Sequence, residues 1–212
     1  DQFLSMERKK FPRFYFLSDD DLLNILGQGK NPREIQHHIK KLFEGIKLLE
    51  MTGPEEKSKS NKTNEIVSMI APDNETVKVL NKVTAEGEVE IWLDQLEKTM
   101  QFTLTKKLLD CYNSPSARKE GASGKKDANS KKDKREWIRN NPGQLVITSA
   151  QIKWTLETEQ NIHKISSETA TKNPLKEQIK GQRRYIKRLV DYVRDPSNNQ
   201  IERNKIVALI TI

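Results

Sequence analysis

The chain has 212 residues, of which 34% are hydrophobic and 32% charged, and its formal net charge is +8. Such a chain can bury the core of one or two modest domains while keeping a large charged surface. Its single cysteine, Cys111, excludes an internal disulfide and fits a reducing compartment, and no Cys/His cluster offers zinc ligands. No apolar stretch reaches the roughly 20 residues of a membrane span, and the first residues do not resemble a signal peptide.

An aromatic run stands near the start of the chain, where four of the thirteen aromatic residues lie between Phe11 and Phe16. Pro12 biases Phe11 toward an extended conformation, so we expect this stretch to be extended chain rather than helix. Ser18 then begins a helix, because its hydroxyl can accept the amide of Asp21 in a capping box. We interpret the aromatic run as an anchor that plugs a helical core, and a ligand-binding aromatic slot is the alternative.

A second helix is expected from Pro32, after Gly27-Gln28-Gly29-Lys30 breaks the first. His37 and His38 lie beside its apolar stripe and are interpreted as surface or rim residues rather than metal ligands. The stripe, at spacings of three and four, consists of Ile35, Ile39, Leu42, Phe43, Ile46 and Leu49. Residues 1–50 are therefore expected to be a helical start to the fold.

The helical period disappears between residues 47 and 83. Three short and partly β-branched pieces, 47–51, 65–70 and 76–80, are separated by turn compositions. They predict a two- or three-stranded antiparallel sheet between about residues 47 and 80. So small a sheet needs helices to support it.

Helical order returns at 85–112, which is the longest uninterrupted helix predicted in the chain. Residues 136–212 are predicted to be helical as well: a short helix at 136–139, then helices from Gln144 to about Ser166, from Pro174 to about 194, and from Ile201 onward. The predicted fold class is mainly α, an elongated antiparallel helical bundle with the small sheet inserted. The apolar end at 207–212 suggests a chain cut from something longer.

Most of the positive charge lies in one tract, Arg118 to Arg135, which has eight Lys or Arg and three Asp or Glu and so contributes +5 of the +8. Because it contains no aromatic or large aliphatic residue, we predict a disordered basic loop over 113–135. A solvated insertion is the favoured interpretation, and binding to tubulin's acidic surface, RNA or another acidic partner is the alternative. The residues that would meet such a partner are Lys125, Lys126, Lys131, Lys132, Lys134 and Arg135.

Two glycine patterns resemble nucleotide-binding loops, but each lacks residues that its motif requires. A phosphate loop over 119–126 would need glycine and Ser/Thr where Lys119 and Lys126 stand, and the dinucleotide fingerprint that begins at Gly27 would need glycine where Pro32 stands. Acidic clusters are explained by helix N-termini. We therefore expect no catalytic, cofactor-binding or metal-ligating residue here, and we expect this chain not to be an enzyme by itself.

The run from Phe11 to Gln28 closely resembles a signature of dynein heavy chains, in the late part of the linker that precedes the first AAA module. The amino-acid sequence from Leu17 to Pro32 is more similar to that of axonemal than to that of cytoplasmic dyneins. Two departures are an Ala71–Glu75 turn where the family often has an EGE-like turn, and the enlarged basic loop. Three further stretches support the resemblance in the expected order: Val89-Glu90-Ile91-Trp92-Leu93 with Leu96-Glu97, Met100 and Thr103-Leu104; Trp137-Ile138 with Pro142-Gly143-Gln144; and Ser149-Ala150-Gln151-Ile152-Lys153-Trp154.

The resemblance implies that residues 1–212 are part of one linker domain, a stiff helical lever that lies across the AAA ring. Such a lever couples ATP hydrolysis to movement along microtubules. The implied partners are the AAA ring of the same heavy chain, other dynein subunits and microtubules, with no membrane or nucleic acid. ATP and magnesium are expected in the AAA modules of the parent chain. The implied location is the cytoplasm and cytoskeleton, with the axoneme of a cilium or flagellum favoured.

Within this interpretation, aromatic residues are structural anchors that keep the lever stiff. They are Phe11, Phe14, Tyr15, Phe16, Trp92, Trp137 and Trp154. The alternative function is a free-standing basic helical adaptor that binds microtubules or RNA through the Lys-rich tract.

Overall fold

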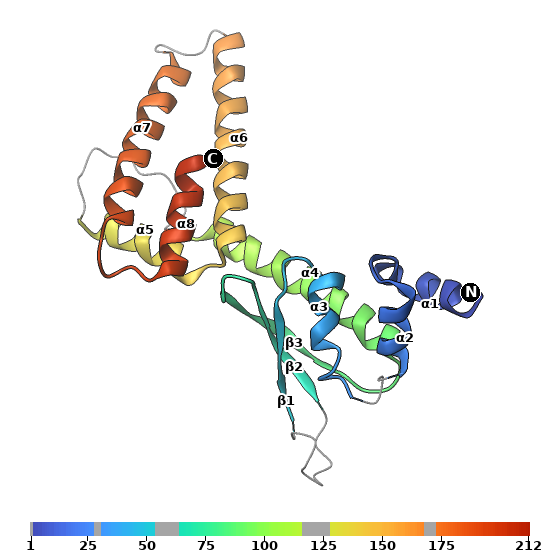
Figure 1. Cartoon of the computed structure of the whole chain (residues 1–212). Helices are drawn as coiled ribbons and strands as arrows, with labels where there is room; N and C mark the ends of the chain where they lie inside the picture. Colours follow the sequence, from blue (N-terminus) through green and yellow to red (C-terminus); the bar gives the residue numbers. More distant parts are fainter. Residues whose placement is uncertain (1, 28–30, 54–63, 116–127, 168–172) are drawn as a thin grey trace. The chain divides into compact units, whose positions relative to one another are not determined.

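The computed structural model describes residues 2–27, 31–53, 64–115, 128–167 and 173–212, with the backbone alone over 128–133. They form two compact units, Asp1–Thr105 (unit 1) and Lys106–Ile212 (unit 2), and the boundary falls inside helix α4 (Val89–Asn113). The described part is mainly helical with one three-stranded antiparallel sheet (Figure 1), which confirms the predicted fold class.

Unit 1 begins with α1 (Gln2–Lys10), a 3₁₀ helix η1 (Pro12–Phe16) and α2 (Asp19–Gly27). Phe11 is extended as predicted, with φ −132° and ψ 97°. The prediction of extended chain for the residues that follow is wrong. Proline suits the first turn of a helix, because its fixed φ is helical and its missing N–H is not needed there.

The predicted cap of α2 by Ser18 is confirmed, although the Asp21 carboxylate meets the Ser18 hydroxyl rather than the backbone amide that a capping box would use. The backbone amide of Asp21 donates to Ser18 Oγ at 3.2 Å, and the Ser18 hydroxyl donates to the Asp21 carboxylate at 2.9 Å. Lys41 Nζ donates to the same carboxylate at 2.7 Å. Lys41 and Ser18 together lower the pKa of Asp21, so the carboxylate is charged where it favours the positive end of the helix dipole.

Helix α3 (Gln36–Leu42) is shorter than the predicted second helix. Residues 32–35 form turns with i to i+3 hydrogen bonds instead of an α-helical start. All six residues of the predicted stripe are buried, although Leu49 lies in a strand. His38 is also buried, contrary to the prediction for it, with Nδ1 3.5 Å from Asp21 Oδ1. Burial lowers the pKa of His38, and His37 is exposed.

The predicted small sheet is confirmed as β1 (Leu48–Thr52), β2 (Glu65–Ile70) and β3 (Thr76–Thr84), in the spatial order β1-β2-β3. Both pairs are antiparallel, and β3 runs four residues past the predicted end. At the β2–β3 turn Asn74 has φ 68°, a left-handed conformation that asparagine tolerates better than most residues.

One hydrophobic core joins the helices and strands of unit 1. Helix α4 begins at Val89, four residues later than predicted, because Gly87 has φ 78° and cannot continue a helix. Trp92 on α4, Phe11 and Phe14 are among the largest fully buried side chains. The rings of Phe11 and Phe14 meet edge to face, with centroids 5.1 Å apart and an interplanar angle of 81°.

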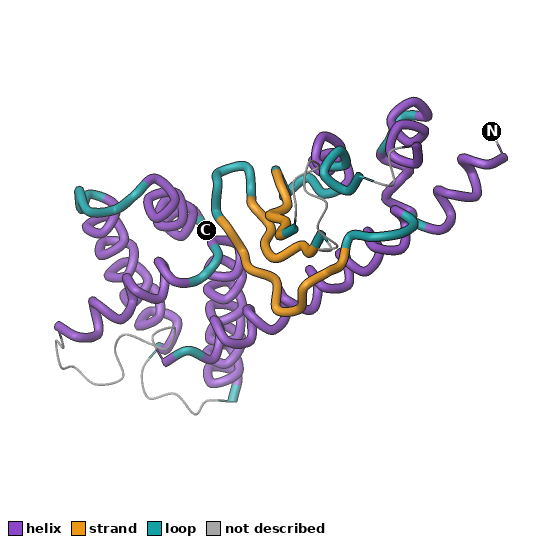
Figure 2. Tube along the Cα trace, turned by 90° about the horizontal axis from the view of Figure 1, so that it is seen from below, coloured by secondary structure: helices purple, strands orange, loops and turns teal. Residues whose placement is uncertain are grey.

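Unit 2 contains the last part of α4 and four further helices, α5 (Ala128–Asn140), α6 (Gly143–Ser166), α7 (Pro174–Val193) and α8 (Gln200–Thr211). Helices α6 and α7 run side by side in opposite directions, and α8 packs against both and against α5 (Figures 1 and 2). Asn173 and Asn199 cap α7 and α8 through their side-chain oxygens. The buried hydrophobic residues of unit 2 are Cys111, Trp137, Ile138, Leu145, Val146, Leu189, Tyr192, Ile206 and Leu209.

The prediction of a disordered loop as far as residue 135 is wrong from Ala128 onward, where α5 begins. Alanine, lysine and arginine have high helix propensity. The buried Trp137 and Ile138 on the same helix give it an apolar face to pack. Residues 116–127 of the predicted loop lie outside the described residues.

Buried and exposed aromatic residues of η1 can be compared directly by substitution. Phe14→Ala should lower the free energy of unfolding of unit 1 by about 3–5 kcal/mol, because it removes a fully buried ring. Phe16→Ala removes the same atoms from an exposed position and should change it by less than about 0.5 kcal/mol. Hydrogen-exchange mass spectrometry along a urea series measures both values; equal losses in the two variants would contradict the packing described here.

Candidate functional site

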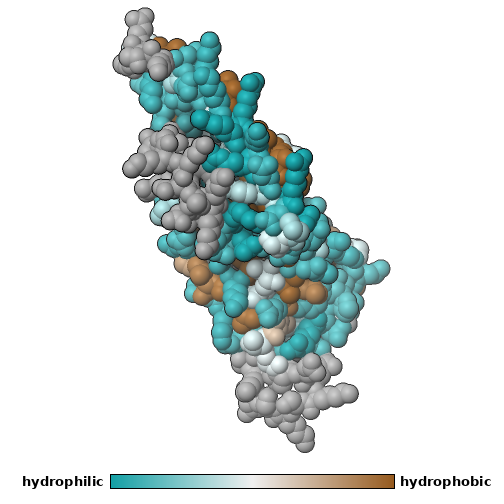
Figure 3. Space-filling model, turned by 90° about the vertical axis from the view of Figure 1, so that its left-hand side faces the viewer, coloured by the Kyte–Doolittle hydropathy of each residue, from teal (hydrophilic) through white to brown (hydrophobic). Residues whose placement is uncertain are grey.

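Four of the seven predicted anchors are core residues: Phe11, Phe14, Trp92 and Trp137 are at most 4% exposed. The three others are not, and their assignment to the core is wrong. Tyr15, Phe16 and Trp154 are 63%, 70% and 53% exposed. Phe11 directly precedes η1, and its carbonyl oxygen accepts the backbone amide of Phe14 at 3.0 Å, so the turn brings these two residues together while the next two point elsewhere. Figure 3 shows hydrophobic surface in small groups among hydrophilic residues on one face of the molecule.

Basic side chains hold the buried aromatic pair in place. Arg13 on η1 donates through Nη1 to the Leu42 carbonyl oxygen at 3.0 Å and through Nη2 to Glu97 Oε1 at 3.1 Å, and its guanidinium lies 4.7 Å from the Phe43 ring centroid. Arg8 Nη2 donates to the Leu17 carbonyl oxygen at 3.1 Å. Arg13 thus ties η1 to both α3 and α4 without leaving its charge uncompensated.

Lys10 joins α1 to α4 in the same unit. Its Nζ lies 2.9 Å from Glu7 Oε1 and 3.0 Å from Glu90 Oε1, and both carboxylates are almost fully buried. Hydrogen bonds to Glu7 and Glu90 raise the pKa of Lys10. The buried carboxylates therefore have a charged partner at the surface of unit 1.

The anchor of unit 2 is Trp137 on α5. Its indole N–H donates to the carbonyl oxygen of Cys111 at 3.0 Å, in a buried position near the end of α4. The Cys111 thiol lies 3.7 Å from the carbonyl oxygen of Leu145 on α6, and burial raises its pKa. Because the thiolate is the reactive form of cysteine, this thiol packs as a small apolar group rather than acting as a nucleophile.

The six residues predicted to meet an acidic partner are not seen together on one surface in the part of the chain that the structure describes. Lys125 and Lys126 lie outside the described residues, and of Lys131 and Lys132 only the helical backbone is described. Lys134 packs into unit 2, with Nζ 4.3 Å from the Trp137 ring centroid and 5.3 Å from that of Tyr185. Burial, with a smaller contribution from nearby Lys153, lowers the pKa of Lys134 to about 8.

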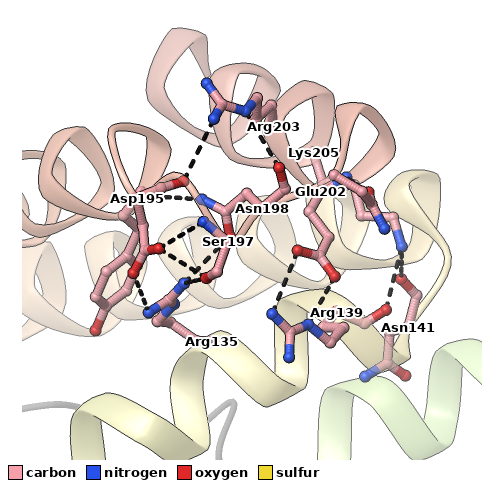
Figure 4. Close-up of polar contacts among 11 residues, drawn as sticks. Arg135, Arg139, Asn141, Asp195, Ser197, Asn198, Glu202, Arg203 and Lys205 are labelled. Atoms are coloured by element: carbon pink, nitrogen blue, oxygen red, sulfur yellow. Dashed lines mark hydrogen bonds and ion pairs between the residues drawn. The ribbon is translucent and has the colours of Figure 1, made fainter.

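Arg135, the last residue of the tract, binds the turn between α7 and α8 (Figure 4). Its Nη1 donates to Asp195 Oδ2 at 2.8 Å, and its Nη2 donates to Asn198 Oδ1 at 3.2 Å. Hydrogen bonds from Ser197, with a further one from Arg135, lower the pKa of Asp195 to about 2. Arg135 is therefore occupied inside unit 2 rather than held out for a partner.

A second set of contacts, one turn further along α5, fixes α8 itself (Figure 4). Arg139 Nε donates to Glu202 Oε1 at 2.6 Å, and its Nη2 donates to Glu202 Oε2 at 3.3 Å. Lys205 Nζ donates to the carbonyl oxygen of Asn141 at 2.8 Å, beyond the end of α5. We call these residues, with Arg135, Asp195 and Asn198, the α5–α8 clamp.

The α5–α8 clamp surrounds a hollow of about 10 Å³, lined by Arg135, Ile138, Arg139, Asn198, Glu202 and Ile206. That volume is at the lower limit for one water molecule, so the hollow cannot take a nucleotide or a metabolite. Within the described ranges, no three His, Cys, Asp or Glu side chains are grouped as metal ligands. None of the helices described has the length and apolarity of a membrane span.

The family model "Dynein heavy chain, N-terminal region 2" matches residues 1–111. The whole chain is 41% identical to the "Dynein-1-beta heavy chain, flagellar inner arm I1 complex" of Chlamydomonas reinhardtii. The chain belongs to the dynein heavy chain family. It is 40% identical over its whole length to human "Dynein axonemal heavy chain 2", and 37% identical over 74% of its length to "Cytoplasmic dynein 2 heavy chain 1" of Tripneustes gratilla. It spans only 3–4% of the length of these three relatives.

Sequence reasoning missed the α5–α8 clamp of this dynein segment. The helix predicted from Pro174 ends at about residue 194 with no role assigned to the turn that follows, and Arg135 is placed in a loop. The spacing of Arg135 and Arg139 by four residues would have placed both on one helix face, had the helix been predicted from Ala128. An Asp-Pro-Ser-Asn turn presents side-chain oxygens that suit such a face.

The clamp predicts a difference between two arginines of unit 2. Arg135→Gln should lower the free energy of unfolding of unit 2 by about 1–2 kcal/mol, because it removes the cation that binds Asp195 and Asn198. Arg194→Gln changes an exposed neighbour of that turn and serves as the matched control. Hydrogen exchange of α8 peptides along a urea series measures the loss, and no difference between the two variants would contradict the clamp.

Lys134 predicts an unusual dependence of stability on pH. Its pKa is lowered in the folded chain, so between about pH 8 and the ordinary lysine pKa the unfolded state binds more protons, and stability rises with pH. From about pH 7.5 to about pH 9.5 Lys134 alone should raise the free energy of unfolding of unit 2 by roughly 1–2 kcal/mol. The buried Cys111 thiol, whose pKa is raised, acts in the opposite direction near the upper end of that range, so the quantity to measure is the difference in unfolding free energy between the wild type and Lys134→Met. A difference that does not grow with pH would contradict the desolvation of Lys134.

Proposed function

We propose that this chain is a linker segment of a dynein motor heavy chain, a lever that couples ATP hydrolysis in the AAA ring to movement along microtubules. The observation that carries the proposal is the family match over residues 1–111, which includes the aromatic run and nearly all of α4. ATP and magnesium would be bound by AAA modules elsewhere in the parent chain. This segment would contribute no catalytic group.

The packing supports a mechanical role, because a lever must resist bending within each of its units. Unit 1 has one core that reaches from α1 to α4, and close-packed interiors have low compressibility. Unit 2 has the α5–α8 clamp, in which arginine forks bind carboxylates with fixed geometry. Both devices join residues far apart in the sequence, so force applied to one helix is shared with the others of its unit.

The relatives support a location for the parent motor. Two relatives that match the whole chain, at 41% and 40% identity, are named as flagellar and axonemal heavy chains. We propose that the parent motor works in the axoneme of a cilium or flagellum, on the cytoskeleton. Its partners there would be the AAA ring of the same heavy chain, other dynein subunits and microtubules.

A motor assay tests the lever. In the parent motor, Phe14→Ala and, separately, Trp92→Ala should lower microtubule gliding velocity while microtubule-stimulated ATP hydrolysis continues, because a loosened core bends instead of transmitting force. Phe14→Leu, which refills most of the space, should restore much of the velocity. Circular dichroism of each variant confirms that the helices remain.

Phe16→Ala is the matched control in the same assay, because Phe16 is exposed. It should leave both velocity and ATP hydrolysis unchanged. Normal velocity and normal hydrolysis in Phe14→Ala and Trp92→Ala would contradict the lever. Equal slowing by Phe16→Ala would show that the aromatic run acts as a contact surface rather than as a core.

A further inference from the structure

Helix α7 carries a concentration of positive charge that the sequence analysis did not single out. It contains six Lys or Arg residues and two acidic residues, a net charge of +4 in 20 residues. Five of the six basic residues are exposed, at spacings that place them along one broad side of the helix: Lys176, Lys180, Arg183, Arg184 and Lys187. We call this side the α7 basic face.

The opposite side of α7 is fixed by packing and by hydrogen bonds. Leu189 and Tyr192 are buried. The buried Gln178 accepts a hydrogen bond from Asn161 Nδ2 at 3.0 Å and donates to Thr158 Oγ1 at 2.9 Å, both on α6. These contacts prevent α7 from rolling, so the basic face stays on the outside of unit 2.

Little of the charge on this face is compensated within unit 2. Lys180 Nζ lies 2.9 Å from Glu177 Oε1, a contact between two exposed side chains. Arg183, Arg184 and Lys187 have no ion-pair partner among the described residues. Three long basic side chains are therefore available on one surface, without an intramolecular competitor in the part of the chain described.

Two exposed apolar residues lie beside the charges. Ile179 and Ile186 are seven residues apart, so they lie on the same side of the helix, and they are 52% and 41% exposed. A nucleic-acid surface would be expected to offer an aromatic ring for base stacking, but Tyr185 on this helix is packed inside unit 2, where burial raises its pKa. An interfacial membrane helix would present a continuous apolar face with aromatic residues such as Trp or Phe, whereas this side of α7 exposes only two isoleucines. Mixed basic and aliphatic contacts fit an acidic polypeptide.

We propose that the α7 basic face docks an acidic segment from another part of the parent heavy chain. The chain covers about 4% of its full-length relatives, so most of the polypeptide lies outside it. Exposed ion pairs are individually weak. A segment on the same polypeptide is held at a high effective concentration, which keeps even a weak interface occupied. The proposal rests on family membership and does not depend on the lever function.

Zero-length cross-linking of the purified parent heavy chain tests this proposal, because a carbodiimide joins a lysine amine only to a carboxylate that touches it. Lys176, Lys180 and Lys187 should cross-link to Asp or Glu of the same polypeptide outside these 212 residues, and the local Lys180–Glu177 product is not counted. In the Arg183→Gln/Arg184→Gln variant the reporter lysines remain, and the yield should fall roughly threefold or more because the attraction is reduced. Raising NaCl from about 0.05 M to about 0.5 M should lower the yield similarly.

The matched control is Lys40→Gln/Lys78→Gln, which removes the same charge from exposed positions of unit 1 and should leave the α7 cross-links unchanged. Four results would overturn the proposal. They are no α7 cross-links to the same chain, α7 cross-links only to a different protein, cross-links only between two copies in a mixture of light and isotopically heavy chains, and unchanged yield in Arg183→Gln/Arg184→Gln. Loss of the cross-links on adding poly-uridylate or phosphatidylserine vesicles, with those lysines protected instead, would assign the face to nucleic acid or membrane.

Discussion

The edge-to-face pair of Phe11 and Phe14 is the contact on which unit 1 depends. Both rings are fully buried, in a core to which α1, α2, α3, the sheet and α4 all contribute. The pair requires an extended residue followed at once by a helical turn, and Phe11-Pro12 supplies both, because proline restricts the residue before it and pre-forms the turn after it. Arg13, next to this pair in sequence, then links η1 to α3 and α4 by donating hydrogen bonds to the Leu42 carbonyl oxygen and the Glu97 carboxylate.

Unit 2 reaches a comparable result by different means. Its core is smaller, and the position of α8 is fixed by the α5–α8 clamp, in which Arg139 forks onto the buried Glu202. Arginine suits this position because its planar group can satisfy two oxygens at once and stays charged at all working pH values. Lys205 adds a hydrogen bond from its Nζ to the backbone carbonyl oxygen of Asn141, just beyond the end of α5. Both units therefore combine an aromatic anchor with arginine contacts at helix ends.

Periodicity and turn chemistry were sufficient to predict α4, α6, α7, the three-stranded sheet and the Ser18 cap, because each of these depends on residues close together in the sequence. Three of the errors concern tertiary contacts. The burial of His38, the start of α5 at Ala128 and the pairing of Arg135 with Asp195 all depend on residues brought together from distant segments. A run rich in Lys and Ser has the composition of a loop, and the packing of Trp137 and Ile138 adds to the helix propensity of its Lys and Arg residues.

The aromatic run that resembles the dynein signature contains two kinds of residue. Phe11 and Phe14 fill the core, whereas Tyr15 and Phe16, next to them in sequence, are mostly exposed. Composition could not distinguish the buried pair from the exposed pair. Hydrophobicity indicates that a side chain can be buried, but it does not indicate the direction in which a 3₁₀ turn points that side chain. Nothing in the packing of unit 1 requires an aromatic side chain at position 15 or 16. The packing of the core of unit 1 therefore involves Phe11, Phe14 and Trp92 and not Tyr15 or Phe16, and the family resemblance of the run as a whole is no measure of what each of its residues does.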